Sequence, residues 1–153
     1  MAQSNEVVVR VGESGIATEI SARGHTLLSD KPMDSGGTGT GPTPYDYLLA
    51  ALGSCTAMTI RLVADRREWP LEGVTVRLRH SRVYENDCRE CEKDSVGIDQ
   101  IERDIDLAGP LTEEQYEGLI RVAERCPVGQ TLARGSRIVP AEARTLDEAP
   151  RVP

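Results

Sequence analysis

The chain has 153 residues and a mass of 16.7 kDa, which fits one ordinary domain and argues against several domains within this length. Its 18 Lys and Arg and 25 Asp and Glu give a formal charge of −7, so nucleic acid and anionic membrane surfaces, whose phosphates would repel it, are not expected as partners. One Trp, four Tyr and no Phe argue against an aromatic stacking platform and predict a core of Val, Leu, Ile and Ala.

The N-terminal region shows no export signal. Residues 7–9 are three valines, a run far too short for the apolar core of a secretory signal. The longest apolar stretch, 47–60, is interrupted by Gly and small polar residues and falls short of the ~20 residues that span a bilayer. We therefore expect a soluble, cytoplasmic protein whose cysteines are thiols with chemistry to do, or packing residues, rather than a disulfide scaffold. These cysteines are Cys55, Cys88, Cys91 and Cys126.

Three short strands are predicted in the first 28 residues. Residues 6–11 are rich in β-branched side chains, and 16–22 and 24–28 are separated by turn signals, which indicates an antiparallel meander. Residues 29–42 contain Pro32 and four glycines and have no periodicity. This segment is a long loop, and long loops in compact domains tend to be functional.

The clearest helix begins at Thr43. Thr43 is an N-cap residue, Pro44 follows at the first helical position, and Asp46 lies in the first turn. The helix is predicted to run to about Arg66. Its first half is apolar on nearly all sides, which predicts burial, and the charged run 65–68 predicts that its end emerges into solvent.

The second half of the chain is predicted to contain two strands, two helices and a last strand. A half-exposed strand is expected over 74–84 and another over 98–107, with an acidic loop between them. Thr112 and Gln115 form a capping box that begins a helix, and Pro127 begins a short one that runs through Ala133. Residues 137–139 are predicted to be a strand. Residues 141–153 are predicted to be a loose C-terminal tail, so that 1–140 forms a single domain.

Two cysteines lie in settings that suggest chemistry. Cys55 lies mid-way along the apolar helix among small residues, so it is either a packing residue or a thiol that a partner element or a substrate can reach. Cys126 precedes Pro127 at a predicted helix start, where unpaired N–H groups and the helix dipole stabilise a thiolate and lower its pKa. On separate helices, the two could meet as an attacking and a resolving thiol.

Two motifs resemble a known family. Residues 41–58 read GPTPYDYLLAALGSCTAM, and residues 126–132 read CPVGQTL. Together and in this order they resemble the OsmC/Ohr family, the osmotically inducible protein C and organic hydroperoxide resistance proteins, with similar element order over about residues 6–140. The resemblance implies an α+β fold with mixed β-sheets around two central helices. It also implies a tightly intertwined homodimer with the active site at the subunit interface.

The resemblance further implies a thiol-dependent hydroperoxide reductase of oxidative-stress defence. Cys55 is then the expected peroxidatic thiol, whose thiolate attacks the O–O bond and becomes a sulfenic acid. Cys126 is the expected resolving thiol, and it closes a disulfide that an external dithiol reduces. This chemistry requires no metal and no organic cofactor.

Two positions depart from the family pattern. Tyr45 stands where the peroxidases have a Glu, and Asp46 follows one position later, where a side chain is turned by ~100° around the helix. Tyr45 either donates a hydrogen bond near the reactive thiol or packs at the helix start. The family's thiolate-holding Arg has no counterpart in residues 25–44, where Lys31 is the only fixed cation. Arg23 and Arg61 are the remaining candidates.

The pair Cys88 and Cys91 forms a Cys-x-x-Cys motif in the acidic loop. It could be a surface pair that forms a reversible disulfide or has no role, half of a zinc site, or a redox dithiol. The neighbouring carboxylates would raise the pKa of both thiols, which argues against a reactive dithiol. His25 and His80 are the only histidines, and we expect both to be ordinary strand residues.

One alternative to the peroxidase remains open from the sequence. A non-catalytic relative would bind a small apolar ligand, or sense oxidants, through the pocket around Cys55. The reactivity of the Cys55 thiol distinguishes the two hypotheses, because an unactivated thiol keeps a pKa near or above ~8.5.

Overall fold

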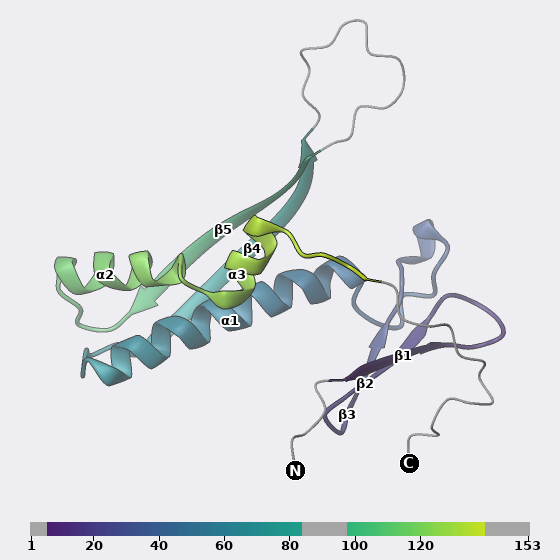
Figure 1. Cartoon of the computed structure of the whole chain (residues 1–153), viewed down its shortest axis with the longest axis horizontal. Helices are drawn as coiled ribbons and strands as arrows, with labels where there is room; N and C mark the ends of the chain where they lie inside the picture. The colour runs from purple at the N-terminus through teal and green to yellow at the C-terminus, as the bar shows by residue number, and fades with distance from the viewer. Residues whose placement is uncertain (1–5, 84–97, 140–153) are drawn as a thin grey trace, which may run out of the picture.

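The computed structural model describes residues 6–83 and 98–139, which fold into two antiparallel sheets and three α-helices (Figure 1). The predicted α+β class is confirmed. Within these ranges every strand pairing is antiparallel rather than mixed. The predicted tail, 141–153, lies outside the described residues, and so do Cys88 and Cys91.

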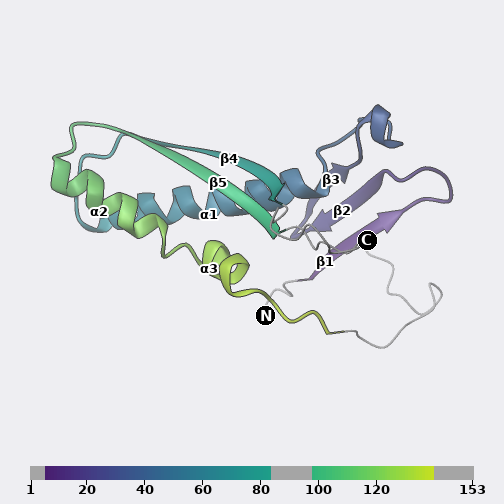
Figure 2. The same cartoon turned by 90° about the horizontal axis from the view of Figure 1, so that it is seen from above.

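The first sheet is the predicted meander, with strands β1 (Val7–Val11), β2 (Thr18–Ala22) and β3 (His25–Ser29) in the order β1-β2-β3. β2 and β3 are joined by the two-residue turn Arg23–Gly24. Both turn residues have positive φ, 49° and 82°, which suits the twist of a tight hairpin. This sheet lies beyond one end of the long helix, apart from the second sheet (Figure 2).

The loop from residue 30 to residue 42 is ordered around one carboxylate. Asp30 is almost fully buried and accepts hydrogen bonds from the backbone N–H of Lys31 at 2.7 Å and of Thr38 at 2.8 Å. It also accepts from the Thr38 hydroxyl at 2.7 Å, and these donors hold the pKa of Asp30 well below its usual range. A Cβ at Gly37 would lie 2.0 Å from the Lys31 carbonyl oxygen, so only glycine fits there. A short 3₁₀ turn (Met33–Ser35) lies within this loop.

The long helix α1 (Pro44–Arg66) begins and ends where its sequence signals predict. Thr43 and Asp46 form a reciprocal cap: the Thr43 hydroxyl accepts from the Asp46 N–H at 3.2 Å, and the Asp46 carboxylate accepts from the Thr43 N–H at 2.8 Å. The Tyr47 hydroxyl donates to the Leu28 carbonyl at 2.5 Å, which ties the first turn of α1 to β3.

The second sheet is a long hairpin of β4 (Gly73–Val83) and β5 (Ile98–Ala108). Because side chains alternate along a strand, one face carries the paired apolar residues Val76 and Ile105, and the other carries charges. On the charged face Arg79 pairs with Asp104 at 2.6 Å. The apolar face packs against α1.

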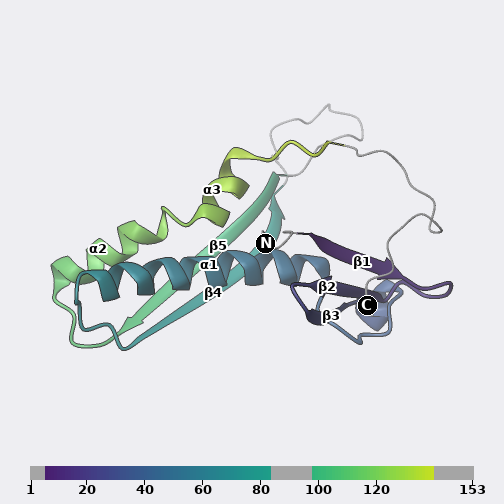
Figure 3. The same cartoon turned by 60° about the horizontal axis from the view of Figure 1, so that its bottom comes forward.

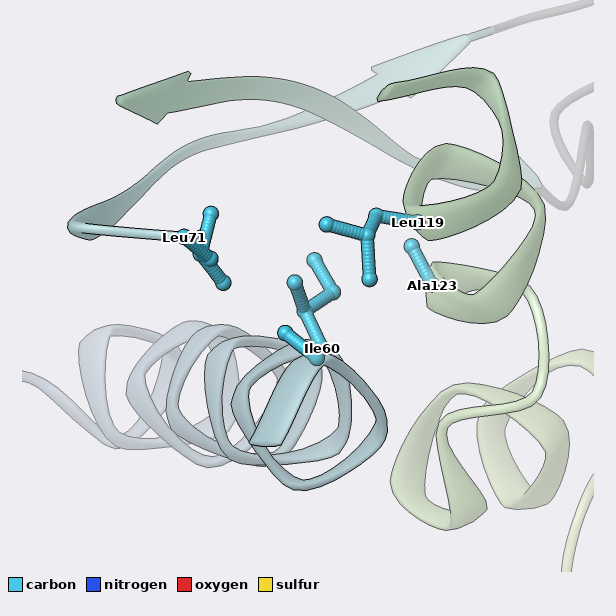
Figure 4. Close-up of a cluster of buried hydrophobic side chains, with 5 residues drawn as sticks. Ile60, Leu71, Leu119 and Ala123 are labelled. Carbon is cyan, nitrogen blue, oxygen red and sulfur yellow. The ribbon is translucent and has the colours of Figure 1, made fainter. Parts of the chain in front are cut away.

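Helices α2 (Glu113–Ala123) and α3 (Pro127–Arg134) pack beside α1 and complete the helical layer (Figure 3). The capping box of Thr112 and Gln115 forms as predicted. Ile60 of α1 and Leu119 of α2 are fully buried against each other at the centre of the core (Figure 4). The cluster consists of Ile60, Ala64, Leu71, Leu119 and Ala123.

Two expectations about these elements are corrected. Residues 137–139 form no strand, and Ile138 is 94% exposed, because no neighbouring strand edge lies beside this segment in the described chain. The predicted burial of the first half of α1 on nearly all sides is wrong for one chain, since Met58 is 64% exposed; Leu62, in the second half, is 63% exposed. These two residues, four positions apart, lie on the same side of the helix.

The expectation that the apolar stretch is too short to span a bilayer is also corrected. α1 has 23 residues and a mean hydropathy of 1.5 in its most apolar window. By length and composition alone, it is therefore long and apolar enough to cross a membrane. The core helix of a soluble protein meets the same criteria, and in this fold α1 packs against β4, α2 and α3.

Candidate functional site

The fold brings together the two cysteines that the sequence places 71 positions apart (126 minus 55). Cys55 lies near the middle of α1, and Cys126 is the N-cap of α3, directly before Pro127. α1 and α3 pack against each other, and the two thiols lie close enough for each to shift the pKa of the other. Both are free thiols, Cys126 fully buried and Cys55 partly exposed.

Cys126 lies in the setting that its helix-start position predicts. Its sulfur accepts a hydrogen bond from the Gly129 N–H at 3.5 Å. Burial alone would raise the pKa of Cys126, but the hydrogen bond from Cys55 and the N–H groups of Gly129 and Val128 outweigh it, and Thr56 adds to them. The pKa of Cys126 is therefore lowered, as expected for a thiol at a helix N-terminus.

Cys55 is shifted in the opposite direction. Burial raises the pKa of its thiol, and the hydrogen bond with Cys126 raises it further, while the Val128 N–H and Thr59 act weakly against both. Within residues 6–83 and 98–139, none of the main influences on this pKa is a cationic side chain. The resemblance leads one to expect the lowered pKa at Cys55, whereas the donors at the start of α3 lower the pKa of Cys126.

Thr56 belongs to this site, although sequence reasoning treated it only as a small neighbour of Cys55. It is fully buried, and its hydroxyl makes no hydrogen bond of normal geometry within the described part of the chain. It nevertheless lies close enough to Cys126 to lower the pKa of that thiol. The sequence signal that could have identified Thr56 was a hydroxyl residue inside a mostly apolar helix, one position after a candidate cysteine.

Tyr45 is not placed beside the thiols. Its ring stacks on His80 with centroids 4.3 Å apart and an angle of 21° between the planes. His80 in turn hydrogen-bonds Asp99 at 2.9 Å through Nε2. The structure thus supports the packing interpretation of Tyr45, and His80, like His25, lies in a strand as expected.

Asp46 and Arg61 are engaged elsewhere as well. The Asp46 carboxylate is held by the Thr43 hydroxyl and N–H, and these bonds lower its pKa. Arg61 donates to the Leu71 carbonyl at 2.6 Å and pairs with Asp65 at 3.4 Å. Neither residue has a described interaction with the cysteine pair, because the cap and the end of the helix offer each a closer partner.

A cleft of about 420 Å³ lies between β5 and α3, and neither cysteine is among its lining residues. Leu52 and Gly129 form part of its wall, and Ile101, Arg103 and Arg134 are among its other lining residues. A Cβ built at Gly129 would lie 3.4 Å from Leu52 and 3.9 Å from the Cys126 sulfur. The wall between the cleft and that sulfur is therefore thin.

The alternatives for Cys88 and Cys91 stay open, since both residues lie outside the described ranges. Across residues 6–83 and 98–139, no three His, Cys, Asp or Glu side chains gather as a metal site would require.

Comparison with known proteins identifies similar sequences and folds. The sequence matches the family described as OsmC-like protein over residues 37–140. The structure resembles the OsmC-like protein of Mycoplasma pneumoniae, with 18% identity, a TM-score of 0.67, and 87% of this chain and 89% of that chain covered. It also resembles the organic hydroperoxide resistance protein OsmC of Legionella pneumophila (20%, 0.62, 86% and 90%) and OhrB of Bacillus subtilis (16%, 0.58, 86% and 91%). No curated protein matched the sequence.

Proposed function

The chain belongs to the OsmC-like protein family, and from this premise we propose that it is a thiol-dependent hydroperoxide reductase of oxidative-stress defence. Cys55 is its peroxidatic residue and Cys126 its resolving residue. The observation that carries the proposal is that α1 and α3 pack together and bring these two thiols close enough for each to shift the pKa of the other.

The reaction runs in two steps on these two sulfurs. The Cys55 thiolate attacks the outer oxygen of the hydroperoxide, the O–O bond breaks, and an alcohol leaves after taking up a proton. Cys126 then attacks the Cys55 sulfenic acid, and the disulfide forms with loss of water. An external dithiol restores both thiols by exchange, so the chain needs no metal or organic cofactor. The partial exposure of Cys55 and the burial of Cys126 suit these roles, because the peroxide must reach the first sulfur only.

The assay is consumption of an alkyl hydroperoxide by the purified protein in the presence of a dithiol. Cys55→Ser is expected to abolish consumption. Cys126→Ser is expected to leave a single turnover that stops at the Cys55 sulfenic acid. The double variant Cys88→Ser/Cys91→Ser is the matched control, since it removes two thiols that the reaction does not use. Equal turnover by Cys55→Ser would refute the mechanism.

We propose that the active form is a homodimer with the site at the subunit interface. Only 22% of the most apolar window of α1 is buried within one chain, and Met58 and Leu62 leave an apolar stripe open on that helix. The separate N-terminal sheet likewise leaves Val7 and Val9 more than half exposed. Exposed apolar surface of this extent marks an interaction site, and a second copy covers it in the proposed assembly. We propose the cytoplasm as its location, where dithiol reductants are present.

A second function is favoured by one observation, the raised pKa of Cys55. A thiol shifted in this direction reacts slowly at neutral pH, as expected for a non-catalytic relative that binds a small apolar ligand or senses oxidants. The rate at which an uncharged alkylating reagent labels Cys55 separates the two functions. Slow labelling together with no peroxide consumption supports the second function, and fast consumption excludes it.

A further inference from the structure

One charged side chain interrupts the apolar face of the second sheet. Arg103 of β5 lies opposite Leu78 of β4, and its neighbours on the same face of β5 are Ile101 and Ile105. The Arg103 side chain is only 18% exposed. A guanidinium in such a place is costly unless hydrogen bonds and an opposite charge compensate it, so its partners indicate what it does there.

The partners of Arg103 lie at the junction between α2 and α3. Its Nη1 group donates to the carbonyl oxygen of Ala123, the last residue of α2, at 3.3 Å. Its Nη2 group donates to the carboxylate of Glu124, the next residue, at 2.5 Å. Because a guanidinium is a rigid fork, the two bonds together fix the end of α2 relative to β5.

The same Ala123 carbonyl also accepts from Cys126. The Cys126 N–H donates to it at 3.2 Å, which closes the two-residue turn between the helices. Cys126 then caps α3, and its sulfur accepts the Gly129 N–H at 3.5 Å. Carbonyls in the last turn of a helix lack a partner within that helix, and this one accepts from both Arg103 and Cys126. One oxygen atom therefore connects β5 to the backbone of the resolving cysteine.

We propose that Arg103 is a positioning residue that holds the α2–α3 junction, and with it the backbone of Cys126, in place for the step that closes the disulfide. The inference rests on the proposed peroxidase function and assigns a residue to its second step. In that step the Cys126 thiolate attacks the Cys55 sulfenic acid, the S–S bond forms and the S–O bond breaks. Hydroxide leaves with the S–O electron pair and takes a proton from solvent to become water.

Arg103 acts in this step through the backbone. Its hydrogen bonds within residues 6–83 and 98–139 go to the Ala123 carbonyl and to Glu124, and neither cysteine sulfur is among these partners. Displacement of an attacking atom by about 1 Å can slow a reaction by up to about 100-fold. The attack of Cys126 therefore depends on how firmly the junction that carries it is held.

Arg103→Met tests the proposal. Methionine keeps a long, unbranched apolar side chain on this face of the sheet and removes both bonds to the junction. Two matched controls separate these bonds from other effects. Glu124→Ala removes the ion pair but keeps the bond from Arg103 to the Ala123 carbonyl. Arg79→Met removes a guanidinium from the other face of the same hairpin, where it pairs with Asp104 at 2.6 Å.

Amide hydrogen exchange of the reduced protein, followed by NMR for each residue, measures how firmly the junction is held without any peroxide. Opening the turn exposes the Cys126 N–H and, in the wild type, also breaks the bond from Arg103. Loss of this charge-assisted bond is expected to speed exchange of the Cys126 N–H about 10- to 100-fold in Arg103→Met. Glu124→Ala should speed it less, and Arg79→Met should leave it unchanged. The amides paired between β4 and β5 should keep the wild-type exchange rate in Arg103→Met.

This measurement is independent of the proposed function. Unchanged exchange of the Cys126 N–H in Arg103→Met overturns the proposal even if the protein reduces peroxide. Equal acceleration of the β4 and β5 amides also overturns it, because Arg103 would then affect only the overall stability. Acceleration by Glu124→Ala as large as that by Arg103→Met overturns the role of the carbonyl contact. Selective acceleration in Arg103→Met supports its hold on the junction even if the wild type is inactive toward peroxide and the proposed function fails.

Rapid mixing with one equivalent of alkyl hydroperoxide tests the link to the reaction. Peroxide loss reports attack by Cys55, and loss of the trappable sulfenic acid reports closure by Cys126. Arg103→Met is expected to slow closure about tenfold and to leave peroxide loss at the wild-type rate. This result, with Arg79→Met closing at the wild-type rate, supports the proposal. Closure at the wild-type rate in Arg103→Met, or equal slowing of both steps, overturns it.

Discussion

Oxidation of the cysteine pair should stabilise the fold by an amount that follows from the positions of Cys55 and Cys126. A bond between them closes a loop of 71 residues (126 minus 55). In the chain-entropy model, closing a loop of that length in the unfolded state raises the free energy of unfolding by about 4 kcal/mol. The native state should contribute little opposing strain, because the two thiols already lie close enough for each to shift the pKa of the other.

Urea unfolding of the reduced and oxidised protein, at one protein concentration, measures this difference. With the urea dependence usual for small proteins, about 4 kcal/mol corresponds to a midpoint shift of roughly 1.5–4 M. Cys126→Ser, treated with the same hydroperoxide, is the control and should show no shift. If mass spectrometry detects the Cys55–Cys126 bond and the midpoint stays where it was, the native state is strained by closure and the inferred adjacency of the thiols is wrong.

Three further outcomes are expected. Ile60→Ala, which leaves a cavity against Leu119, should lower the free energy of unfolding by about 2–5 kcal/mol in urea titrations, and a loss below 1 kcal/mol would contradict the described core. Met58→Glu should raise the dissociation constant of the proposed dimer about 30- to 1000-fold in sedimentation analysis. Each copy would lose the burial of a Met side chain that is 64% exposed in one chain. An unchanged dissociation constant would place the interface elsewhere. The pKa of Asp30 is lowered in the folded state, so its stabilisation is present above its unfolded pKa of about 4 and lost as pH falls below it. Asp30→Asn should therefore show a shallower loss of stability on acidification, and equal slopes for both proteins would contradict the loop geometry.

The element boundaries that the sequence predicted well are those marked by local chemistry. Thr43 and Pro44 signal the start of α1, and Thr112 with Gln115 signals the start of α2; both caps form as expected. Such signals succeed because a cap is satisfied by residues within one turn of the chain. The strand predicted at 137–139 failed because a strand needs a neighbouring edge, which its own sequence cannot supply.

Predictions for the supporting site residues depended on distant partners. Tyr45 stacks on His80, 35 positions away (80 minus 45), and Arg61 donates to the Leu71 carbonyl, contacts that the sequence alone could not show. The burial of the Thr56 hydroxyl without a hydrogen-bond partner in the described chain could not be inferred from its neighbours in the sequence.

The amino-acid sequence by itself determined the family, the α+β class and the ends of the main helices, and it indicated the two cysteines of the proposed reaction. Those properties follow from consecutive residues: periodicity, caps and short motifs. Only the tertiary structure decided that Cys55 and Cys126 lie close together and that their pKa values shift in opposite directions. The reason is that the pKa of a thiol depends on its burial and on the donors around it, and α1 and α3 supply these donors only once they pack together.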